Sequence, residues 1–265
     1  MKVKINEIEL YYDTKGQGEP LIFIHGVGGS SLFWLPQIDP LSPYFKVLVY
    51  DLRGHGLSSI PPSGYSIRDH TEDLYLLLNR LELNKVSICG LSMGGMIAQE
   101  FALKYPERVN KLILAGTTPS VEYISKEVME WFLRDAEIVE KNKTRALTAN
   151  DFIAKAYSKE FIKSNEQIIK RVIERISTSP YEGYVQSVRE MFKEPKWSVV
   201  NKLNRIKVPT LIVHGSKDEI IPIKAAEEIR RRIKNSKLII LDAGHAVSFE
   251  RPTEFNKALI DFLKS

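Results

Sequence analysis

The sequence predicts an α/β fold, with a mostly parallel, doubly wound sheet and a helical cap inserted into it. Short apolar runs alternate with longer segments of helical periodicity over most of the 265 residues. These runs are continuously apolar, as in strands that helices cover on both faces. Between residues 119 and 200 the alternation stops and only helical patterns remain. Alternating strands and helices indicate a parallel sheet, and the interruption indicates an all-helical insertion.

The individual elements follow from this alternation. Residues 2–5 and 8–13 are expected to form an N-terminal hairpin. The apolar runs predict six further strands, at residues 21–24, 47–50, 86–89, 112–115, 210–213 and 238–241. Helical periodicity predicts helices at residues 66–80, 93–105, 222–233 and 252–263. We therefore expect a core made of residues 1–118 and 201–265, with residues 119–200 forming a cap (a lid) over one end of the sheet.

Composition excludes several classes of protein. The chain has 38 Lys and Arg against 33 Asp and Glu, a net charge of +5, and 43% hydrophobic residues, which argues against disorder. Its basic residues are spread along the chain, and the densest cluster, Arg230–Arg232, lies on a predicted helix just after Glu227 and Glu228. No apolar run is long enough to span a membrane. We expect a cytoplasmic monomer or homodimer with no nucleic-acid or membrane partner.

The strongest chemical signal is Gly90-Leu91-Ser92-Met93-Gly94, between the strand at 86–89 and the helix at 93–105. A serine on such a strand-to-helix turn has a strained backbone, and its hydroxyl projects above the sheet. Gly90 and Gly94 have no side chain to clash in so tight a turn. Ser92 is therefore the candidate nucleophile.

A nucleophilic serine needs a histidine base and an acid that orients it. Among five histidines, His245 follows the last strand, so its loop lies at the sheet edge where parallel strands deliver their carboxyl ends. Asp218 follows the strand at 210–213 and is the expected acid, with Asp242 as the alternative on the same turn as His245. The chain order serine, acid, histidine is typical of this kind of turn.

Two backbone N–H groups are expected to form the oxyanion hole. Met93 begins the helix after Ser92, where N–H groups point outward and favour negative charge. Val27, or alternatively Gly26, lies in the glycine-rich stretch after the strand at 21–24. This stretch partly resembles a dinucleotide-binding loop, but the position of its third glycine is occupied by Ser31. No nucleotide site is therefore predicted.

Several motifs together resemble the α/β-hydrolase superfamily, in its carboxylesterase and 3-oxoadipate enol-lactonase branch. They span the chain except for residues 119–200, and they are specific for the fold but not for the substrate. The matching segments are His25-Gly26, Asp51–Ser58, the turn around Ser92, Pro106–Val109, Pro209–Gly215 with Asp218, and Gly244-His245 with Glu250 and Pro252.

The resemblance also implies roles for residues outside the triad. Asp51, Arg53 and His55 are expected to form a structural turn network, and His25 is expected to support the oxyanion loop. Cys89, inside a strand, is expected to be inert core.

Four aromatic residues are candidates for substrate binding. Trp34 is expected either to pack beneath the site or to line it. Trp131, Phe132 and Tyr157, in the expected cap, are candidates for lining an acyl pocket, although aromatic residues at helical spacing often only pack.

Together these residues predict a serine hydrolase that cleaves small carboxylic esters through an acyl-enzyme, with no metal or organic cofactor. The same triad would also serve a lactonase such as an enol-lactonase, a carbon–carbon bond hydrolase or a perhydrolase. In an enzyme for acidic lactones, Arg134 or Arg189 is the candidate for holding a substrate carboxylate. A ligand-binding receptor that has lost catalysis is the non-enzymatic alternative, and the intact set of Ser92, Asp218 and His245 argues against it.

Overall fold

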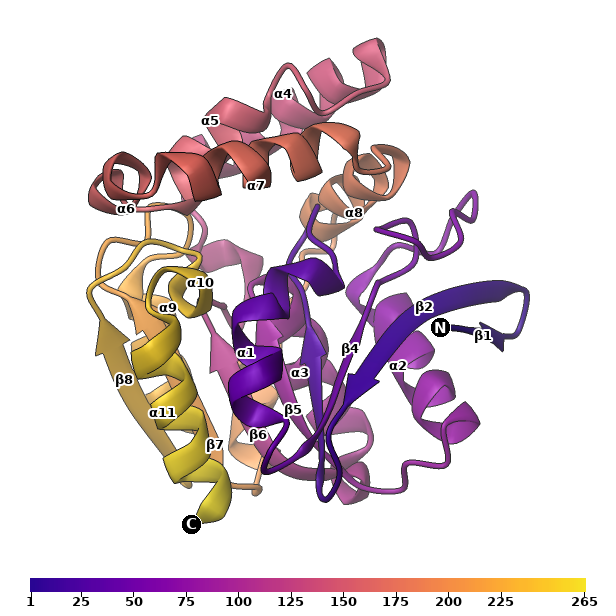
Figure 1. Cartoon of the computed structure of the whole chain (residues 1–265), viewed down its shortest axis with the longest axis vertical. Coiled ribbons are helices and arrows are strands. Elements are labelled where there is room, and N and C mark those ends of the chain that lie inside the picture. Colours follow the sequence, from indigo (N-terminus) through magenta and orange to yellow (C-terminus); the bar gives the residue numbers. More distant parts are fainter.

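A computed structural model of the chain describes residues 1–265 and is centred on one eight-stranded sheet (Figure 1). In chain order the strands are β1 (Lys2–Ile5), β2 (Ile8–Lys15), β3 (Pro20–Ile24), β4 (Lys46–Tyr50), β5 (Val86–Leu91), β6 (Val109–Ala115), β7 (Thr210–Gly215) and β8 (Ser236–Leu241). Their order in the sheet is β1-β2-β4-β3-β5-β6-β7-β8. The two pairings of β2, with β1 and with β4, are antiparallel, and all the other pairings are parallel. The predicted, mostly parallel α/β sheet is confirmed.

Helices cover both faces of this sheet because successive side chains of each strand point to opposite faces. In β3, Leu21 and Phe23 pack with the apolar side chains of α1 (Leu35–Leu41), α10 (Val247–Glu250) and α11 (Pro252–Lys264). Ile22 and Ile24 pack in the core that includes α2 (Ile67–Arg80), α3 (Met93–Lys104) and α9 (Ile223–Arg232). All these side chains of β3 are buried, which explains why the strand is continuously apolar.

Helix prediction succeeded where the periodicity was long. Helices α2, α3, α9 and α11 begin and end within one residue of the predicted bounds. Helices α1 and α10 were not predicted. The first spans seven residues and contains Pro36 and Pro40, and the second has four residues, so neither offers a helical repeat.

Five helices between β6 and β7, which we call the cap, lie over the carboxyl ends of the parallel strands (Figure 1). They are α4 (Lys126–Asn142), α5 (Ala149–Ala156), α6 (Lys159–Ser164), α7 (Glu166–Thr178) and α8 (Glu182–Phe192). All five fall inside the predicted insertion at 119–200. Short 3-10 helices at Ser31–Trp34, Pro106–Arg108, Val121–Tyr123 and Val200–Arg205 complete the fold.

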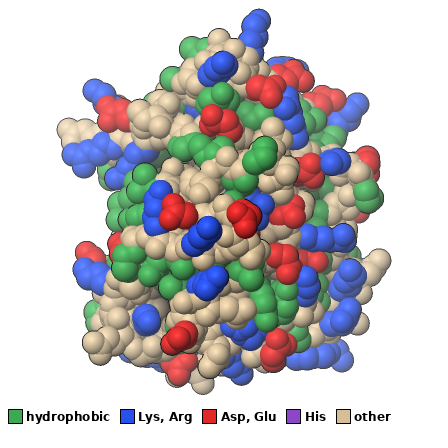
Figure 2. Space-filling view, turned by 90° about the vertical axis from the view of Figure 1, so that its right-hand side faces the viewer, with side chains coloured by type: hydrophobic (Ala, Val, Ile, Leu, Met, Phe, Trp, Pro, Cys, Tyr) green, Lys and Arg blue, Asp and Glu red, His purple; other side chains and the backbone are tan.

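The surface carries both signs of charge. Figure 2 shows acidic and basic side chains interspersed over the face that it presents. None of the helices combines the length and the apolarity that crossing a membrane would require.

Candidate active site

Ser92 lies on a sharp turn between β5 and α3. Its backbone angles are φ 54° and ψ −120°, an unusual conformation for a residue with a side chain. A Cβ atom at Gly90 would come within 2.2 Å of the Gly94 carbonyl oxygen, and one at Gly94 within 2.2 Å of the Ile24 carbonyl oxygen. The close contact between β3, β5 and α3 therefore requires glycine at both positions. The strained turn presents the Ser92 hydroxyl at the carboxyl edge of the sheet.

His245 is paired with Asp218 and not with Asp242. The distance between His245 Nδ1 and Asp218 Oδ2 is 2.8 Å, and the other oxygen of Asp218 accepts the N–H groups of Ile220 and Ile221 at 2.9 Å each. Burial alone would raise the pKa of Asp218, but the charge and hydrogen bond of His245, together with smaller effects of His214 and the Ile221 N–H, lower it overall. The ionised carboxylate orients the ring and leaves Nε2 free for a substrate-side partner.

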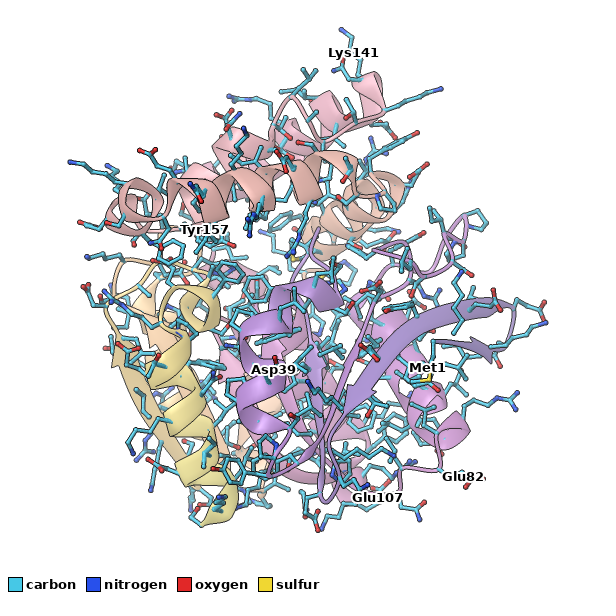
Figure 3. The ribbon with its side chains drawn as sticks, in the orientation of Figure 1. Met1, Asp39, Glu82, Glu107, Lys141 and Tyr157 are labelled. Atoms are coloured by element: carbon cyan, nitrogen blue, oxygen red, sulfur yellow. The ribbon has the colours of Figure 1, made fainter.

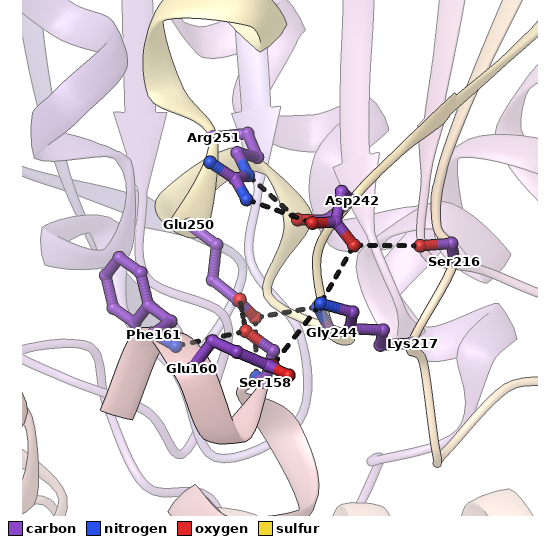
Figure 4. A network of polar contacts seen from close by, with 9 residues as sticks. All are labelled: Ser158, Glu160, Phe161, Ser216, Lys217, Asp242, Gly244, Glu250 and Arg251. Carbon is purple, nitrogen blue, oxygen red and sulfur yellow. Dashed lines mark hydrogen bonds and ion pairs between the residues drawn. The ribbon is translucent and has the colours of Figure 1, made fainter. Parts of the chain in front are cut away.

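The alternative acid, Asp242, has a different environment (Figure 4). Its side chain is exposed and pairs with Lys217 at 2.9 Å and with Arg251 at 3.3 Å. The Asp242 carboxylate is therefore paired with two surface cations, and it is not the partner of His245.

Ser92 and His245 line the same pocket beneath the cap. No hydrogen bond joins the Ser92 hydroxyl to the His245 ring in this structure. In enzymes without a bound substrate this contact is often long and tightens when the substrate binds.

The loop at 26–29 lies beside Ser92, where an oxyanion hole is expected. A Cβ atom at Gly26 would come within 3.2 Å of the Ser92 Cβ. The Gly26 carbonyl accepts two hydrogen bonds, from His25 Nδ1 at 2.7 Å and from the Gly29 N–H at 3.1 Å. These bonds fix the Gly26–Val27 peptide, whose N–H belongs to Val27 and has no hydrogen-bond partner within the protein. The Met93 N–H begins α3 and is among the groups that a helix leaves unpaired.

His25 and His55 hold this loop from below. His25 Nε2 accepts the Leu52 N–H at 3.1 Å, and His55 Nε2 accepts the Gly28 N–H at 3.1 Å. Since each ring accepts at Nε2 and donates at Nδ1, both histidines are neutral. Burial lowers the pKa of His25 to about 4. Burial, with smaller electrostatic contributions from His25 and Arg145, lowers the pKa of His55 to about 3.

These two histidines predict loss of stability in acid. Unfolded histidine has a pKa of about 6.5, so below that pH the unfolded chain binds protons that the folded chain excludes. The free energy of unfolding should therefore fall as the pH decreases from 6.5, by about 2 kcal/mol per histidine at pH 5, and continue to fall toward pH 3. Urea denaturation at pH 7.5 and pH 5 measures this difference. Equal free energies of unfolding at the two pH values would contradict the prediction.

Asp51 and Arg53 have structural partners near this loop. Asp51 accepts the N–H groups of Ser31 at 2.6 Å and Leu57 at 2.8 Å. The Arg53 guanidinium forms two hydrogen bonds with the buried carboxylate of Asp73. Neither side chain lines the pocket.

Cys89 is fully buried in the core, where burial raises its pKa.

The structure divides the four aromatic candidates for substrate binding. Phe132 and Tyr157 line the pocket, and Tyr157 lies where the cap meets the core (Figure 3). Trp34 does not line it: the ring is fully buried beneath the site, 4.7 Å from the Phe23 ring between centroids. Trp131 also lies outside the pocket, with its ring packed against Phe132 at 4.6 Å. Of the two roles expected for Trp34, the structure therefore shows packing beneath the site, and the Trp131 ring likewise packs behind the pocket lining.

Arg175, on α7, is a pocket residue that the sequence analysis missed. It is the only Arg, Lys, Asp or Glu residue among those that line the pocket, and it pairs with no carboxylate. Its charge reaches Tyr157: burial and the Glu250 charge raise the pKa of Tyr157, and Arg175 opposes that rise. The predicted alternatives lie elsewhere. Arg189 pairs with Glu140 at 2.6 Å on the surface.

Arg134, the other predicted arginine, is exposed and does not line the pocket. The apolar lining residues that the sequence did not identify include Phe33, Phe152, Val172, Ile176 and Phe249. Helical periodicity identifies the buried side of α7, but it cannot tell a side chain that faces a cavity from one that packs against a neighbour.

A buried carboxylate joins the cap to the loop that carries His245 (Figure 4). Glu250 is 6% exposed and accepts the N–H groups of Ser158 at 3.1 Å and Gly244 at 2.9 Å, and it also accepts the Ser158 hydroxyl. Ser158 caps the first turn of α6. In addition, the Ala246 N–H donates to the Ala156 carbonyl at 2.9 Å. The cap is therefore fastened on both sides of His245.

Comparison with known proteins identifies the family. Residues 19–252 match the family described as alpha/beta hydrolase fold. The chain belongs to this family. Its sequence is 29% identical over 260 residues to 3-oxoadipate enol-lactonase 2 of Acinetobacter baylyi, an alignment that covers 97% of this chain and 94% of the relative.

Two solved structures of alpha/beta hydrolases resemble this chain closely. The enol-lactonase from Burkholderia xenovorans has a TM-score of 0.92 and 25% identity, with 100% of both chains covered. A thermophilic esterase from Thermogutta terrifontis has a TM-score of 0.90 and 30% identity, with 100% of this chain and 98% of that chain covered. The chain is therefore an enzyme of the alpha/beta hydrolase superfamily, with lactonase and esterase relatives.

Proposed function

We propose that this enzyme hydrolyses small carboxylic esters with Ser92 as nucleophile, His245 as base and Asp218 as the acid that orients the base. The observation that carries the proposal is the 2.8 Å contact of His245 Nδ1 with Asp218, on a ring that shares the pocket with Ser92. A serine on a strained turn, a histidine base and a buried carboxylate are together the groups that acyl transfer requires. The reaction needs no metal or organic cofactor in this mechanism.

The chemical steps follow from these positions. The Ser92 oxygen attacks the ester carbonyl while His245 Nε2 takes the hydroxyl proton. Negative charge develops on the carbonyl oxygen, which the N–H groups of Val27 and Met93 stabilise. His245 then donates its proton to the leaving alcohol as the ester bond breaks, and an acyl-enzyme remains. Water, deprotonated by His245, attacks the acyl group and releases the carboxylic acid and free Ser92.

The pocket lining supports an apolar acyl or alcohol group in the substrate. Phe132, Phe152, Val172 and Ile176 line the part of the pocket beneath the cap. Burying apolar surface contributes about 25 cal/mol per Å² to binding, so an apolar acyl chain would be favoured over a polar one.

The cytoplasmic location and the monomeric or homodimeric state that the sequence predicts stay predictions.

A lactonase is the second candidate, and Arg175 is the observation that favours it. An unpaired guanidinium at an otherwise uncharged pocket suits a substrate that carries a carboxylate, since arginine binds carboxylates with two parallel hydrogen bonds. The relatives named as enol-lactonases agree with this alternative. A lactone differs from an open ester only in that its leaving alcohol stays attached to the acyl group.

Replacing Arg175 with glutamine is expected to separate acidic from neutral substrates. For the mononitrophenyl ester of a dicarboxylic acid, KM should rise about tenfold, because a charged hydrogen bond contributes about 1.5–3 kcal/mol. For a neutral ester of equal length, KM should stay within about twofold. Arg134→Gln, on an exposed part of the cap, is the matched control. Equal changes for both esters would show that Arg175 does not bind the carboxylate.

The proposed function is tested by a substrate screen on the purified protein. Nitrophenyl esters of increasing acyl length and lactones of increasing ring size report both candidate activities in one set of assays. Esters should be hydrolysed faster than in buffer, with a preference for apolar acyl chains. Failure to hydrolyse any ester or lactone above the buffer rate would contradict the proposal.

A further inference from the structure

The loop between α4 and α5 carries a buried arginine, Arg145, that the mechanism has not used. Arg145 is 1% exposed, yet no carboxylate forms an ion pair with it. The guanidinium instead lies over the rings of Tyr184, at 4.1 Å from the centroid, and Phe152, at 5.2 Å. Burial lowers the pKa of Arg145, and the nearby Tyr184 and Asp135 oppose this shift. A guanidinium stays protonated at neutral pH, so the cap encloses a positive charge without a paired anion.

The partner of this guanidinium belongs to the loop at 26–29 of the core. Arg145 Nη1 donates a hydrogen bond of 2.5 Å to the Gly28 carbonyl, across 117 positions of sequence. The guanidinium of Arg145 lies directly against Gly28, because a Cβ atom at Gly28 would lie 2.5–2.8 Å from three guanidinium atoms. Gly28 also has a positive φ of 69°. A side chain at this position would therefore meet both backbone strain and the arginine.

Arg145 completes the support of the expected oxyanion loop. The core holds this loop through His25, on the Gly26 carbonyl, and through His55, on the Gly28 N–H. The Gly28 carbonyl is the remaining polar group of that residue, and it is held from the cap by Arg145. Val27, with its unpaired N–H, lies between the two fixed peptides.

We propose that Arg145 is a positioning residue through which the cap fixes the oxyanion loop and places a positive charge near the developing oxyanion. The inference rests on the proposed function, since it assigns a role in the same acyl transfer. A buried charge acts strongly in a low dielectric, and preorganised groups of this kind favour the transition state over the ground state. Arg145 does not itself line the pocket, so it acts through the loop and through its field.

The test compares Arg145→Met, which removes the charge, with Arg145→Lys, which keeps the charge but cannot reproduce the planar group. Arg189→Met is the matched control on the cap, because Arg189 pairs only with Glu140 at the surface. For each variant we would measure kcat and KM on a nitrophenyl ester. We would also measure the affinity of a trifluoromethyl ketone, which forms an oxyanion with the serine, and of the corresponding secondary alcohol, which does not.

We expect Arg145→Met to lower kcat about tenfold or more, since small displacements at a site are costly, and to change KM by less than about twofold. Affinity for the ketone should fall in parallel while affinity for the alcohol stays unchanged. Arg145→Lys should recover part of both losses, and Arg189→Met should behave like the wild type. A purely structural role would lower the affinities for ketone and alcohol together, or would lower only the melting temperature.

The inference is overturned if folded Arg145→Met keeps the wild-type kcat and ketone affinity. If that variant does not fold, Arg145→Lys decides: selective loss of ketone affinity supports the inference, and unchanged ketone affinity contradicts it. A kcat close to that of the wild type in Ser92→Ala would instead overturn the proposed function. Hydrolysis that requires Ser92 but is insensitive to Arg145 would overturn this inference alone.

Discussion

Replacing Ser92 with alanine is expected to lower kcat for ester hydrolysis by about a millionfold. The change removes the atom that forms the acyl-enzyme and leaves the pocket and His245 in place. The remaining oxyanion donors and the bound geometry would still give slow hydrolysis above the uncatalysed rate. The residual rate can be measured as the release of nitrophenol from a nitrophenyl ester that the wild-type enzyme hydrolyses. The reaction is followed for hours at a high concentration of the variant.

Ser216→Ala is the matched control for the Ser92 variant. Ser216 lies on the loop after β7, and its hydroxyl contacts only the exposed Asp242, at 3.5 Å. The control should keep kcat within about twofold of the wild type, as is usual for exposed sites outside the chemistry. A Ser92→Ala variant as active as Ser216→Ala would rule out Ser92 as the nucleophile.

Replacing Asp218 with asparagine is expected to lower kcat about ten-thousandfold, the size of effect found when a triad carboxylate becomes an amide. The carboxylate accepts three hydrogen bonds, from His245 and from the N–H groups of Ile220 and Ile221. An amide of the same shape can keep the two backbone bonds by presenting its oxygen to them. Its NH2 group would then face His245 Nδ1, favouring the tautomer whose Nε2 already carries a proton and cannot act as a base.

Asp242→Asn provides the comparison within the same region of the sheet edge. Asp242 pairs with Lys217 and Arg251 at the surface, so its loss should change kcat less than about threefold. The ratio of kcat between the two variants isolates the effect of the His245 partner. Similar activities for Asp218→Asn and Asp242→Asn would contradict the assignment of Asp218.

Much of the fold was predictable because parallel strands buried on both faces leave a plain record in the sequence. Runs such as Leu21–Ile24 have no alternation to confuse them with exposed strands, and α3 begins directly after the glycine-rich turn at Ser92. The chemistry was predictable for a related reason. Parallel strands bring their carboxyl ends to one edge, so residues that follow different strands, such as Asp218 and His245, meet there.

The cap was harder to interpret because its helices are polar on one side and apolar on the other. This pattern would be the same however the helices were placed on the core, so it does not show which side chains face the pocket. Trp131 and Phe132 are neighbours on α4, and only the second faces the pocket. Arg175 and Arg145 are two of many basic residues with helical or loop spacing. Nothing local shows that the first reaches the pocket or that the second is buried against Gly28. Those roles depend on how the cap sits on the core, which is fixed by long-range contacts.

The central claim is that Ser92 is a nucleophile activated by His245, and labelling with a fluorophosphonate followed by peptide mass spectrometry tests it most directly. The reagent bonds to an activated serine with loss of fluoride, so its mass marks the residue that attacks. We predict one adduct, on the peptide that contains Ser92, and strongly slowed labelling in a folded His245→Ala variant. Folded wild-type protein that remains unlabelled at Ser92, or that is labelled equally fast without His245, would contradict the account.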